Sequence, residues 1–167
     1  SMNLLQAVNQ STLDNLLGYA EAVAGQFYDQ KSWAKGKKVY WANSGAMADL
    51  GKMAPETWLG QLIDIYDPVQ GKFTDNVGRN VTGTNAKKLF TTDALFFLQH
   101  GAEHELQVSR MLAMMEFTKA VDKDGNQLKN KDGSVMTILD AHKKDKKGRV
   151  RIDPKVANFN KMDFMNK

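Results

Sequence analysis

The chain has 167 residues, 42% of them hydrophobic and 25% charged, and carries a formal net charge of +4. An apolar fraction of this size predicts a folded domain with a core and excludes an intrinsically disordered chain. The absence of cysteine excludes disulfide bonds, thiolate metal sites and cysteine nucleophiles.

Charge is distributed unevenly along the chain. The first 30 residues contain Asp14, Glu21 and Asp29 and no Lys or Arg, whereas the segment after Val121 contains twelve Lys or Arg and seven Asp. We recognise no secretory leader and no apolar run of the roughly 18 residues that cross a bilayer. We therefore expect a cytoplasmic protein with no membrane partner and with a basic carboxyl-terminal region.

The first predicted helix begins near Ser11, which can cap its amino terminus while Asp14 completes a capping pattern. Apolar residues then recur at helical spacing and form one stripe, the pattern of a helix that packs against a core. The stripe consists of Leu13, Leu16, Leu17, Ala20, Val23 and Phe27.

Residues 31–45, rich in Lys and aromatic side chains, are predicted to form a loop or a short strand, and a short helix is predicted for residues 45–52. The next helix is expected to begin at Pro55, since proline suits the first helical position. It is expected to end before Pro68, because the residue that precedes proline avoids the helical conformation.

The segment from Thr92 to about Ala120 is predicted to be one long helix. Apolar residues lie on two roughly opposite sides of it, and a helix that is apolar on two sides is buried on two sides. Polar residues between these sides, Glu103 and Arg110, are expected to be paired or exposed. One apolar side contains Leu95, Leu98, Ala102, Leu106, Leu112, Ala113, Phe117 and Ala120, and the other contains Phe97, Val108, Met111 and Met115.

After Val121 the sequence changes to short turns and strands. Two Asp-Gly pairs, at Gly125 and Gly133, predict turns. Short strands are predicted for residues 135–139 and 149–152, and a weak last helix from Asp153. We expect a mainly α (α+β) fold, a helical bundle around the long buried helix with a small carboxyl-terminal β-hairpin. We expect residues 2–121 to form a helical core. Residues 122–167 are expected to form a basic hairpin and a short helix that pack on the same domain.

One local pattern suggests a metal site. His100, Glu103 and His104 match H-x-x-E-H, in which two histidines one helical turn apart bind zinc and the Glu acts as a base. A zinc hydrolase also needs a third ligand, and the chain has no Glu after Glu116 and only one further histidine, His142. We therefore expect no cofactor and no catalytic site, with packed histidines, and keep zinc at His100 and His104 as the alternative.

Two basic segments suggest nucleic-acid binding, because cations neutralise phosphates and aromatic rings stack on bases. The alternative is that the aromatic side chains pack in the core and the cations are solvated. The candidate residues of the first segment are Trp33, Lys35, Lys37, Lys38, Tyr40 and Trp41, and those of the second are Lys143, Lys144, Lys146, Lys147, Arg149 and Arg151.

The stretch from Lys87 to Met115, KKLFTTDALFFLQHGAEHELQVSRMLAMM, resembles segments of very large proteins from tailed bacteriophages. Those segments contain a Glu-His pair, a Gln and a Met-Leu-Ala run before a hairpin with a Gly turn, an order also followed by SVMTILDAHKK and GRVRID. The resemblance implies a phage-encoded structural or accessory domain, in a virion or in the host cytoplasm, and assigns no catalytic residue.

These observations lead to three hypotheses for function. The first is a non-enzymatic helical domain that binds another protein or has a structural role, since a coherent core pattern occurs without a catalytic constellation. The second is a nucleic-acid-binding module that uses the two basic segments. The third is a zinc hydrolase built on the H-x-x-E-H pattern.

Overall fold

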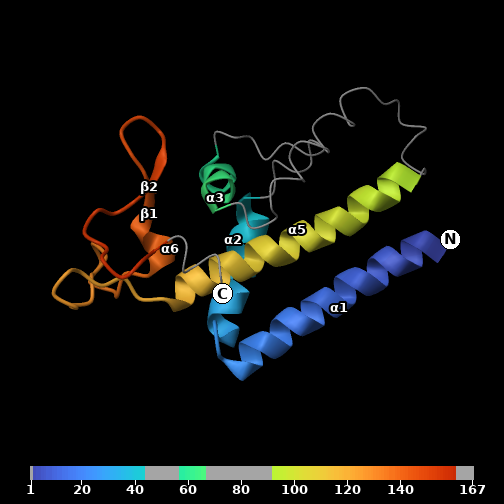
Figure 1. Ribbon diagram of the computed structural model, residues 1–167, viewed down its shortest axis with the longest axis horizontal. Helices are drawn as coiled ribbons and strands as arrows, with labels where there is room; N and C mark the ends of the chain where they lie inside the picture. The colour runs from blue at the N-terminus through green and yellow to red at the C-terminus, as the bar shows by residue number, and fades with distance from the viewer. Residues whose placement is uncertain (1, 44–56, 67–91, 161–167) are drawn as a thin grey trace.

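The computed structural model describes residues 2–43, 57–66 and 92–160. This part of the chain contains five helices and one two-stranded antiparallel hairpin near the carboxyl terminus (Figure 1). The prediction of a mainly helical fold with a small carboxyl-terminal hairpin is therefore confirmed. None of the helices in these ranges is both long and apolar enough to cross a membrane.

Helix α5 (Thr92–Phe117) is the central element, with α1 (Met2–Ala24) alongside it and α2 (Gln30–Asn43) crossing it (Figure 1). The prediction of one helix from Thr92 is confirmed, and the helix continues through Gly101. The helix ends at Phe117 and not near Ala120, and Phe117 itself is 38% exposed. The other described residues of both predicted apolar sides of α5 are buried. The residues are Leu106, Leu112 and Ala113 on one side and Val108, Met111 and Met115 on the other.

A tight corner joins α1 to α2. Gly25 ends α1 with a φ of 66°, a left-handed conformation that favours glycine, and its N–H donates to the Glu21 carbonyl at 3.1 Å. Asp29 precedes α2, and its carboxylate accepts a hydrogen bond from the Ser32 N–H at 2.7 Å. The left-handed Gly25 and the Asp29 hydrogen bond therefore set the direction of α2 relative to α1.

Two predictions for these helices are wrong. α1 begins at Met2 and not near Ser11, and residues 31–43, expected to be loop or strand, belong to α2. Lys alternating with aromatic residues resembles a strand pattern, but burial in α2 follows the turns of a helix. The predicted helix 45–52 and the predicted start at Pro55 lie outside the described residues. The buried residues of α2 are Ser32, Trp33, Gly36 and Tyr40.

α2 crosses α5 at short range because both helices have small residues at the contact. A Cβ built on Gly36 would lie 2.7 Å from the Ser109 carbonyl oxygen and 2.9 Å from the Ala113 nitrogen, both backbone atoms. α1 packs in a similar way, since a Cβ on Gly18 would lie 2.6 Å from the Trp33 ring. Separation between packed helices depends on side-chain size at the contact, so these glycines determine how closely the three helices approach.

Helix α3 (Trp58–Tyr66) is hydrogen-bonded to the carboxyl-terminal hairpin. Gln61 Nε2 donates to the Gly148 carbonyl at 2.9 Å, and Gln61 Oε1 accepts from the Val150 N–H at 2.7 Å. One amide side chain thus satisfies a donor and an acceptor of the hairpin backbone. The apolar side of α3 joins the main core through Leu59, Leu62, Ile63 and Tyr66.

Residues 118–160, here named the carboxyl-terminal part, contain three tight turns with the same backbone pattern. In each turn the first residue donates its N–H to the carbonyl of the fifth and accepts at its own carbonyl from a glycine at the fourth position. The glycines, Gly125, Gly133 and Gly148, have φ values of 81°, 86° and 75°. The turns predicted at the two Asp-Gly pairs are therefore confirmed.

Three backbone hydrogen bonds close a ring at the base of these turns. The Ala120 N–H donates to the Met136 carbonyl at 2.9 Å, and the Leu128 N–H donates to the Ala120 carbonyl at 2.9 Å. The Met136 N–H completes the ring by donating to the Leu128 carbonyl at 2.8 Å. Helix α6 (Ile138–Ala141) follows, capped by Thr137.

The hairpin consists of β1 (His142–Lys144) and β2 (Val150–Ile152), paired antiparallel. β2 confirms the strand predicted for residues 149–152. The strand predicted for residues 135–139 is wrong, because Val135 makes only an isolated bridge and the segment leads into α6. The helix predicted from Asp153 is also wrong as far as residue 160, which the structure shows as turns and irregular backbone.

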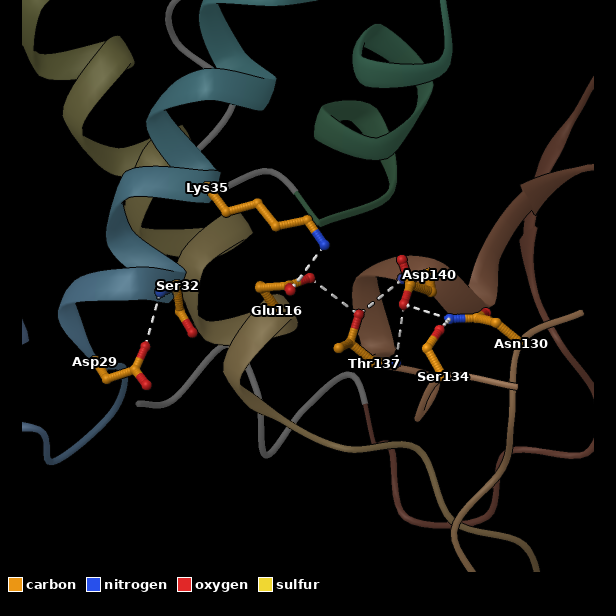
Figure 2. A network of polar contacts seen from close by, with 8 residues as sticks. All are labelled: Asp29, Ser32, Lys35, Glu116, Asn130, Ser134, Thr137 and Asp140. Atoms are coloured by element: carbon orange, nitrogen blue, oxygen red, sulfur yellow. Dashed lines mark hydrogen bonds and ion pairs between the residues drawn. The ribbon is translucent and has the colours of Figure 1, made fainter. Parts of the chain in front are cut away.

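A chain of polar contacts connects the helices to the carboxyl-terminal part (Figure 2). Lys35 Nζ on α2 contacts Glu116 Oε1 on α5 at 2.7 Å, and the Thr137 hydroxyl donates to Glu116 Oε2 at 3.1 Å. Asp140 accepts from the Thr137 N–H at 3.2 Å and from Asn130 Nδ2 at 3.0 Å. Glu116 therefore connects Lys35 of α2 to Thr137 of the carboxyl-terminal part.

Candidate interaction surfaces

The outer side of α1 carries a row of exposed apolar side chains. Leu16 is 60% exposed, Leu17 56% and Val23 57%. The expectation that this stripe packs against a core is wrong, because α1 contacts α2 and α5 through its other side and lies at the edge of the helical part (Figure 1). The α1 stripe is defined as six residues of α1 together with Phe27, which lies three residues beyond the helix end, and all seven are exposed. The six are Leu13, Leu16, Leu17, Ala20, Val23 and Ala24.

The inner side of α1 is made of small or polar residues. Asn15 Oδ1 accepts a hydrogen bond from Lys37 Nζ, Gly18 lies against the Trp33 ring, and Ala22 is buried. These three α1 residues recur at i, i+3 and i+7, which places them on one side of the helix. Close contact with Trp33 requires the small side to face inward, so the large apolar residues of the stripe face outward.

Polar contacts fix α1 in this orientation. Glu21 accepts hydrogen bonds from the Tyr28 hydroxyl at 2.6 Å and from Arg110 Nη2 at 2.7 Å. Burial of the Tyr28 phenol and the neighbouring Glu21 carboxylate raise the pKa of Tyr28, which keeps it a hydrogen-bond donor. The prediction that Arg110 is paired or exposed is confirmed, whereas the Glu103 side chain, for which the same was predicted, lies outside the described ones. The stripe therefore lies on a helix that is held by charged hydrogen bonds on its opposite side.

The structure separates the candidates of the first basic segment. Trp33 and Tyr40 are in the core, where Trp33 stacks on Tyr28 at 5.7 Å between ring centroids, and neither is available for stacking on bases. Lys35 pairs with Glu116, and Lys37 is turned inward. The members that are exposed on α2 are Lys35, whose side chain is 43% exposed beside Glu116, Lys38 and Trp41.

Lys37 is part of an internal charge pair. Its Nζ contacts Glu105 Oε1 on α5 and lies 5.2 Å from the centroid of the Trp33 ring. The Glu105 side chain is only 9% exposed, so its charge requires the nearby cation. The ammonium group of Lys37 and the carboxylate of Glu105 therefore neutralise each other where the three helices meet, and neither is directed at solvent.

The second basic segment forms the hairpin and its exposed turn. Lys143 on β1 lies directly opposite Arg151 on β2, so both occupy the same face of the ribbon. Asp145 Oδ2 lies 3.4 Å from both Arg149 Nε and Arg151 Nε. The remaining cations of the segment, Lys144, Lys146 and Lys147, are exposed.

Acidic residues of the carboxyl-terminal part are used mainly to close its turns. Asp122 Oδ1 accepts from the backbone N–H groups of Asp124 and Asn126, each at 2.9 Å. Asp145 accepts from the backbone N–H groups of Lys147 and Arg149 in the same way. These hydrogen bonds lower the pKa of both carboxyl groups. The lysines beside them project into solvent, so this part presents an exposed positive surface.

The H-x-x-E-H residues lie on α5. Its continuous backbone places His100 and His104 one helical turn apart, as their spacing predicts, but their side chains lie outside the described ones. Among the described side chains, no cluster of three or more His, Cys, Asp or Glu residues could hold a metal ion.

The remaining histidine forms a buried pair that sequence reasoning did not identify. Tyr66 Oη lies 2.5 Å from His142 Nε2, and His142 Nδ1 lies 2.7 Å from the Ile138 carbonyl oxygen. A carbonyl can only accept, so Nδ1 carries the proton and Nε2 accepts from the Tyr66 hydroxyl. Burial lowers the pKa of His142 and raises that of Tyr66 to about 12. Both groups are therefore neutral at pH 7 and belong to the core.

Comparison of the chain with protein-family models, with curated proteins and with solved structures gives no match. The surfaces are therefore interpreted from their own geometry and chemistry.

Proposed function

We propose that this protein is a non-enzymatic helical interaction domain that binds another protein through the α1 stripe. The observation that carries the proposal is the contiguous row of exposed large apolar side chains, including Leu13, Leu16, Leu17 and Val23. Isolated exposed apolar residues are ordinary, whereas a contiguous patch is typical of a protein-binding surface.

The shape of the stripe favours a helical partner. Its members on α1, from Leu13 to Ala24, recur at helical spacing over about 17 Å of helix, at 1.5 Å per residue. Recognition of this kind uses side chains at i, i+3, i+4 and i+7 as anchors in a complementary apolar surface. On α1, Leu13, Leu16, Leu17 and Ala20 have that spacing.

Internal pairing of buried polar groups also supports a non-catalytic role. Lys37 is paired with Glu105, and His142 with Tyr66. In both pairs the two side chains belong to helices or strands that pack in the fold, so the pairing is structural.

The location that we propose is the cytoplasm, or a virion if the resemblance to phage proteins reflects common origin.

Site-specific photo-crosslinking tests the proposal. A photoreactive amino acid is placed at Leu16 or Val23 on the α1 stripe, and at Lys38, which is exposed on α2, as the matched control. We expect protein adducts in producing cells from the stripe positions and few from Lys38. Equal adduct yields at all three positions would contradict the proposal.

A second candidate function, nucleic-acid binding, is favoured by the register of the hairpin. Lys143 and Arg151 are directly opposite one another, and like charges in that relation destabilise a strand pair. Asp145, 3.4 Å from Arg151 Nε, offsets part of this repulsion, and a phosphate beside Lys143 and Arg151 would offset more of it. The hairpin carries this candidate function, because Trp33 and Tyr40 of the first segment are buried.

Fluorescence anisotropy with single- and double-stranded oligonucleotides at two salt concentrations tests the second candidate. We expect binding that weakens with salt, and a smaller salt dependence for Lys143→Gln, by about 0.7 to 0.9 in the logarithmic slope. Lys123→Gln, at an exposed position in another turn, is the control. Absence of binding at low salt would eliminate this function.

A further inference from the structure

We infer that the outer face of the β1–β2 hairpin binds the phosphate backbone of a nucleic-acid duplex, and that Asp145 competes with phosphate for two arginines of this face. The outer face is defined as Lys143, Asp145, Arg149 and Arg151. The inference rests on the second candidate function, since it names the class of nucleic acid and the mode of contact.

The register of the hairpin brings these four side chains to one face. Lys143 lies directly opposite Arg151. Two residues further along each strand direction, the Asp145 N–H donates to the Arg149 carbonyl at 2.8 Å. Residues two apart on a strand share a face. Val150, which alternates with the arginines, is buried on the opposite face.

The hairpin is fixed to α3 through its backbone. Trp58 Nε1 donates to the His142 carbonyl at 2.8 Å, and Gln61 hydrogen-bonds to the backbone of Gly148 and Val150. Figure 1 shows the turn of the hairpin projecting away from α5 and α6. The cations of the outer face therefore lie on a backbone that is ordered before binding, which reduces the entropy lost when a ligand binds.

One carboxylate oxygen lies between two guanidinium groups of the outer face. Asp145 Oδ2 is 3.4 Å from Arg149 Nε and from Arg151 Nε, and the two arginine side chains are 55% and 62% exposed. Solvent and salt screen exposed ion pairs, so both contacts are weak. A phosphate oxygen carries the same kind of charge and pairs well with guanidinium groups. The two arginines therefore surround a position that suits an anionic oxygen.

The composition of the hairpin favours a duplex over a single strand. Proteins that bind single strands combine cations with aromatic rings on which the bases stack. Residues 142–152 contain six Lys or Arg, one Asp and no Phe, Tyr or Trp. A duplex carries one negative charge per about 1.7 Å of its axis, roughly twice the density along one strand. A surface that offers charge alone therefore binds the duplex more tightly.

The same composition predicts contact with phosphates and not with sugars. Residues 142–152 contain no Ser, Thr, Asn or Gln. Recognition of RNA uses hydrogen bonds to the 2′-hydroxyl, whereas phosphate contacts carry no information on sequence. We therefore expect similar affinities for DNA and RNA duplexes and for duplexes of unrelated sequence.

Asp145→Asn tests the competition, because it removes the charge and keeps an oxygen that can accept the N–H groups of the turn. Asn130 already occupies the first position of another turn with the same backbone pattern. Asp122→Asn, at the first position of a third turn, is the matched control with the same change in net charge. Circular dichroism checks the fold of both variants.

Fluorescence anisotropy at low salt compares a short DNA duplex, an RNA duplex of the same sequence and one DNA strand alone. We expect the DNA duplex to bind about tenfold more tightly than the single strand. Asp145→Asn should bind the duplex about threefold more tightly than the unmodified chain, and Asp122→Asn should bind it equally. A gain in affinity does not arise from a damaged fold.

Four outcomes would count against the inference. Equal affinity for duplex and single strand would contradict the duplex as partner, while nucleic-acid binding would stand. Equal gains from Asp145→Asn and Asp122→Asn would reduce the role of Asp145 to net charge. A strong preference for the RNA duplex would show that the 2′-hydroxyl is recognised. Absence of binding to every oligonucleotide would eliminate the second candidate function and this inference together.

Discussion

The helical part and the carboxyl-terminal part are stabilised in different ways. The three helices meet through residues far apart in the sequence, such as Gly36 against Ser109, and their separation depends on the absence of a Cβ. The carboxyl-terminal part is stabilised by local turns, in which Asp side chains such as Asp122 accept backbone N–H groups a few residues away. Tolerance of substitution should therefore differ sharply between the two parts.

The largest expected effect comes from Gly36→Ala. The added methyl group would lie 2.7 Å from the Ser109 carbonyl oxygen, and that atom is backbone that can move only if α5 moves. Overpacking of this kind costs about 3 kcal/mol of the free energy of unfolding. Urea denaturation followed by circular dichroism measures this loss.

Gly125→Ala is the matched control in the carboxyl-terminal part. Its Cβ would meet no atom within 4 Å, and only the positive φ of 81° opposes the substitution. We expect a cost of about 1 kcal/mol. Equal costs at Gly36 and Gly125 would remove the distinction between the two parts.

The next effect concerns the Lys37–Glu105 pair. Lys37→Met leaves the largely buried Glu105 carboxylate without its cation, and we expect a loss of about 2 to 3 kcal/mol. The double variant Lys37→Met/Glu105→Leu should recover most of this loss, because neither charge is then buried alone. A double-mutant cycle by urea denaturation measures the coupling, and additive effects would argue against a shared role.

A third prediction concerns the pH dependence of the interface between α3 and the carboxyl-terminal part. Burial lowers the pKa of His142 below its ordinary value of 6.5, so the unfolded state binds its proton first as the pH falls. The contribution of this group to stability is complete above about pH 6.5 and decreases below it, by at most about 1.4 kcal/mol per pH unit.

The measurement for this third prediction is the free energy of unfolding between roughly pH 5 and 8. His142→Gln should show a shallower dependence on pH than the unmodified chain below pH 6.5. Carboxyl groups with lowered pKa, such as that of Asp140, lose their contribution at lower pH. Parallel curves for the two proteins would show that His142 does not titrate in this way.

The smallest expected effect is at the connection between the two parts. Thr137→Val removes both the helix cap of α6 and the hydrogen bond to Glu116, while it keeps the shape of the side chain. We expect a loss of about 1 kcal/mol. Thermal unfolding measures the change, and Thr118→Val, whose hydroxyl donates only to the Met114 carbonyl, is the control.

Local signals predicted the carboxyl-terminal turns and strand β2, since Asp-Gly pairs and alternating residues act over a few positions. The central helix was also predictable, because α5 is apolar on two sides along its length. Helix α2 was missed because its lysines are satisfied by distant acids, Glu116 and Glu105, which no local pattern reveals.

The direction of the α1 stripe could not be predicted for a related reason. Periodicity identifies which residues share a side of a helix, but it does not determine which side meets the neighbouring helix. Here Gly18 and Ala22 face inward because the bulky ring of Trp33 occupies the space beside α1. The Tyr66–His142 pair was missed because 76 residues separate its members.

The ring formed by Ala120, Leu128 and Met136 closes through main-chain atoms alone, and its members are eight residues apart. Its hydrogen bonds are insensitive to side-chain identity, except that proline has no N–H to donate. A lineage could replace most residues between these positions and keep the ring, provided that the two intervals keep their length. Insertions and deletions, more than substitutions, should therefore be excluded from this stretch during evolution.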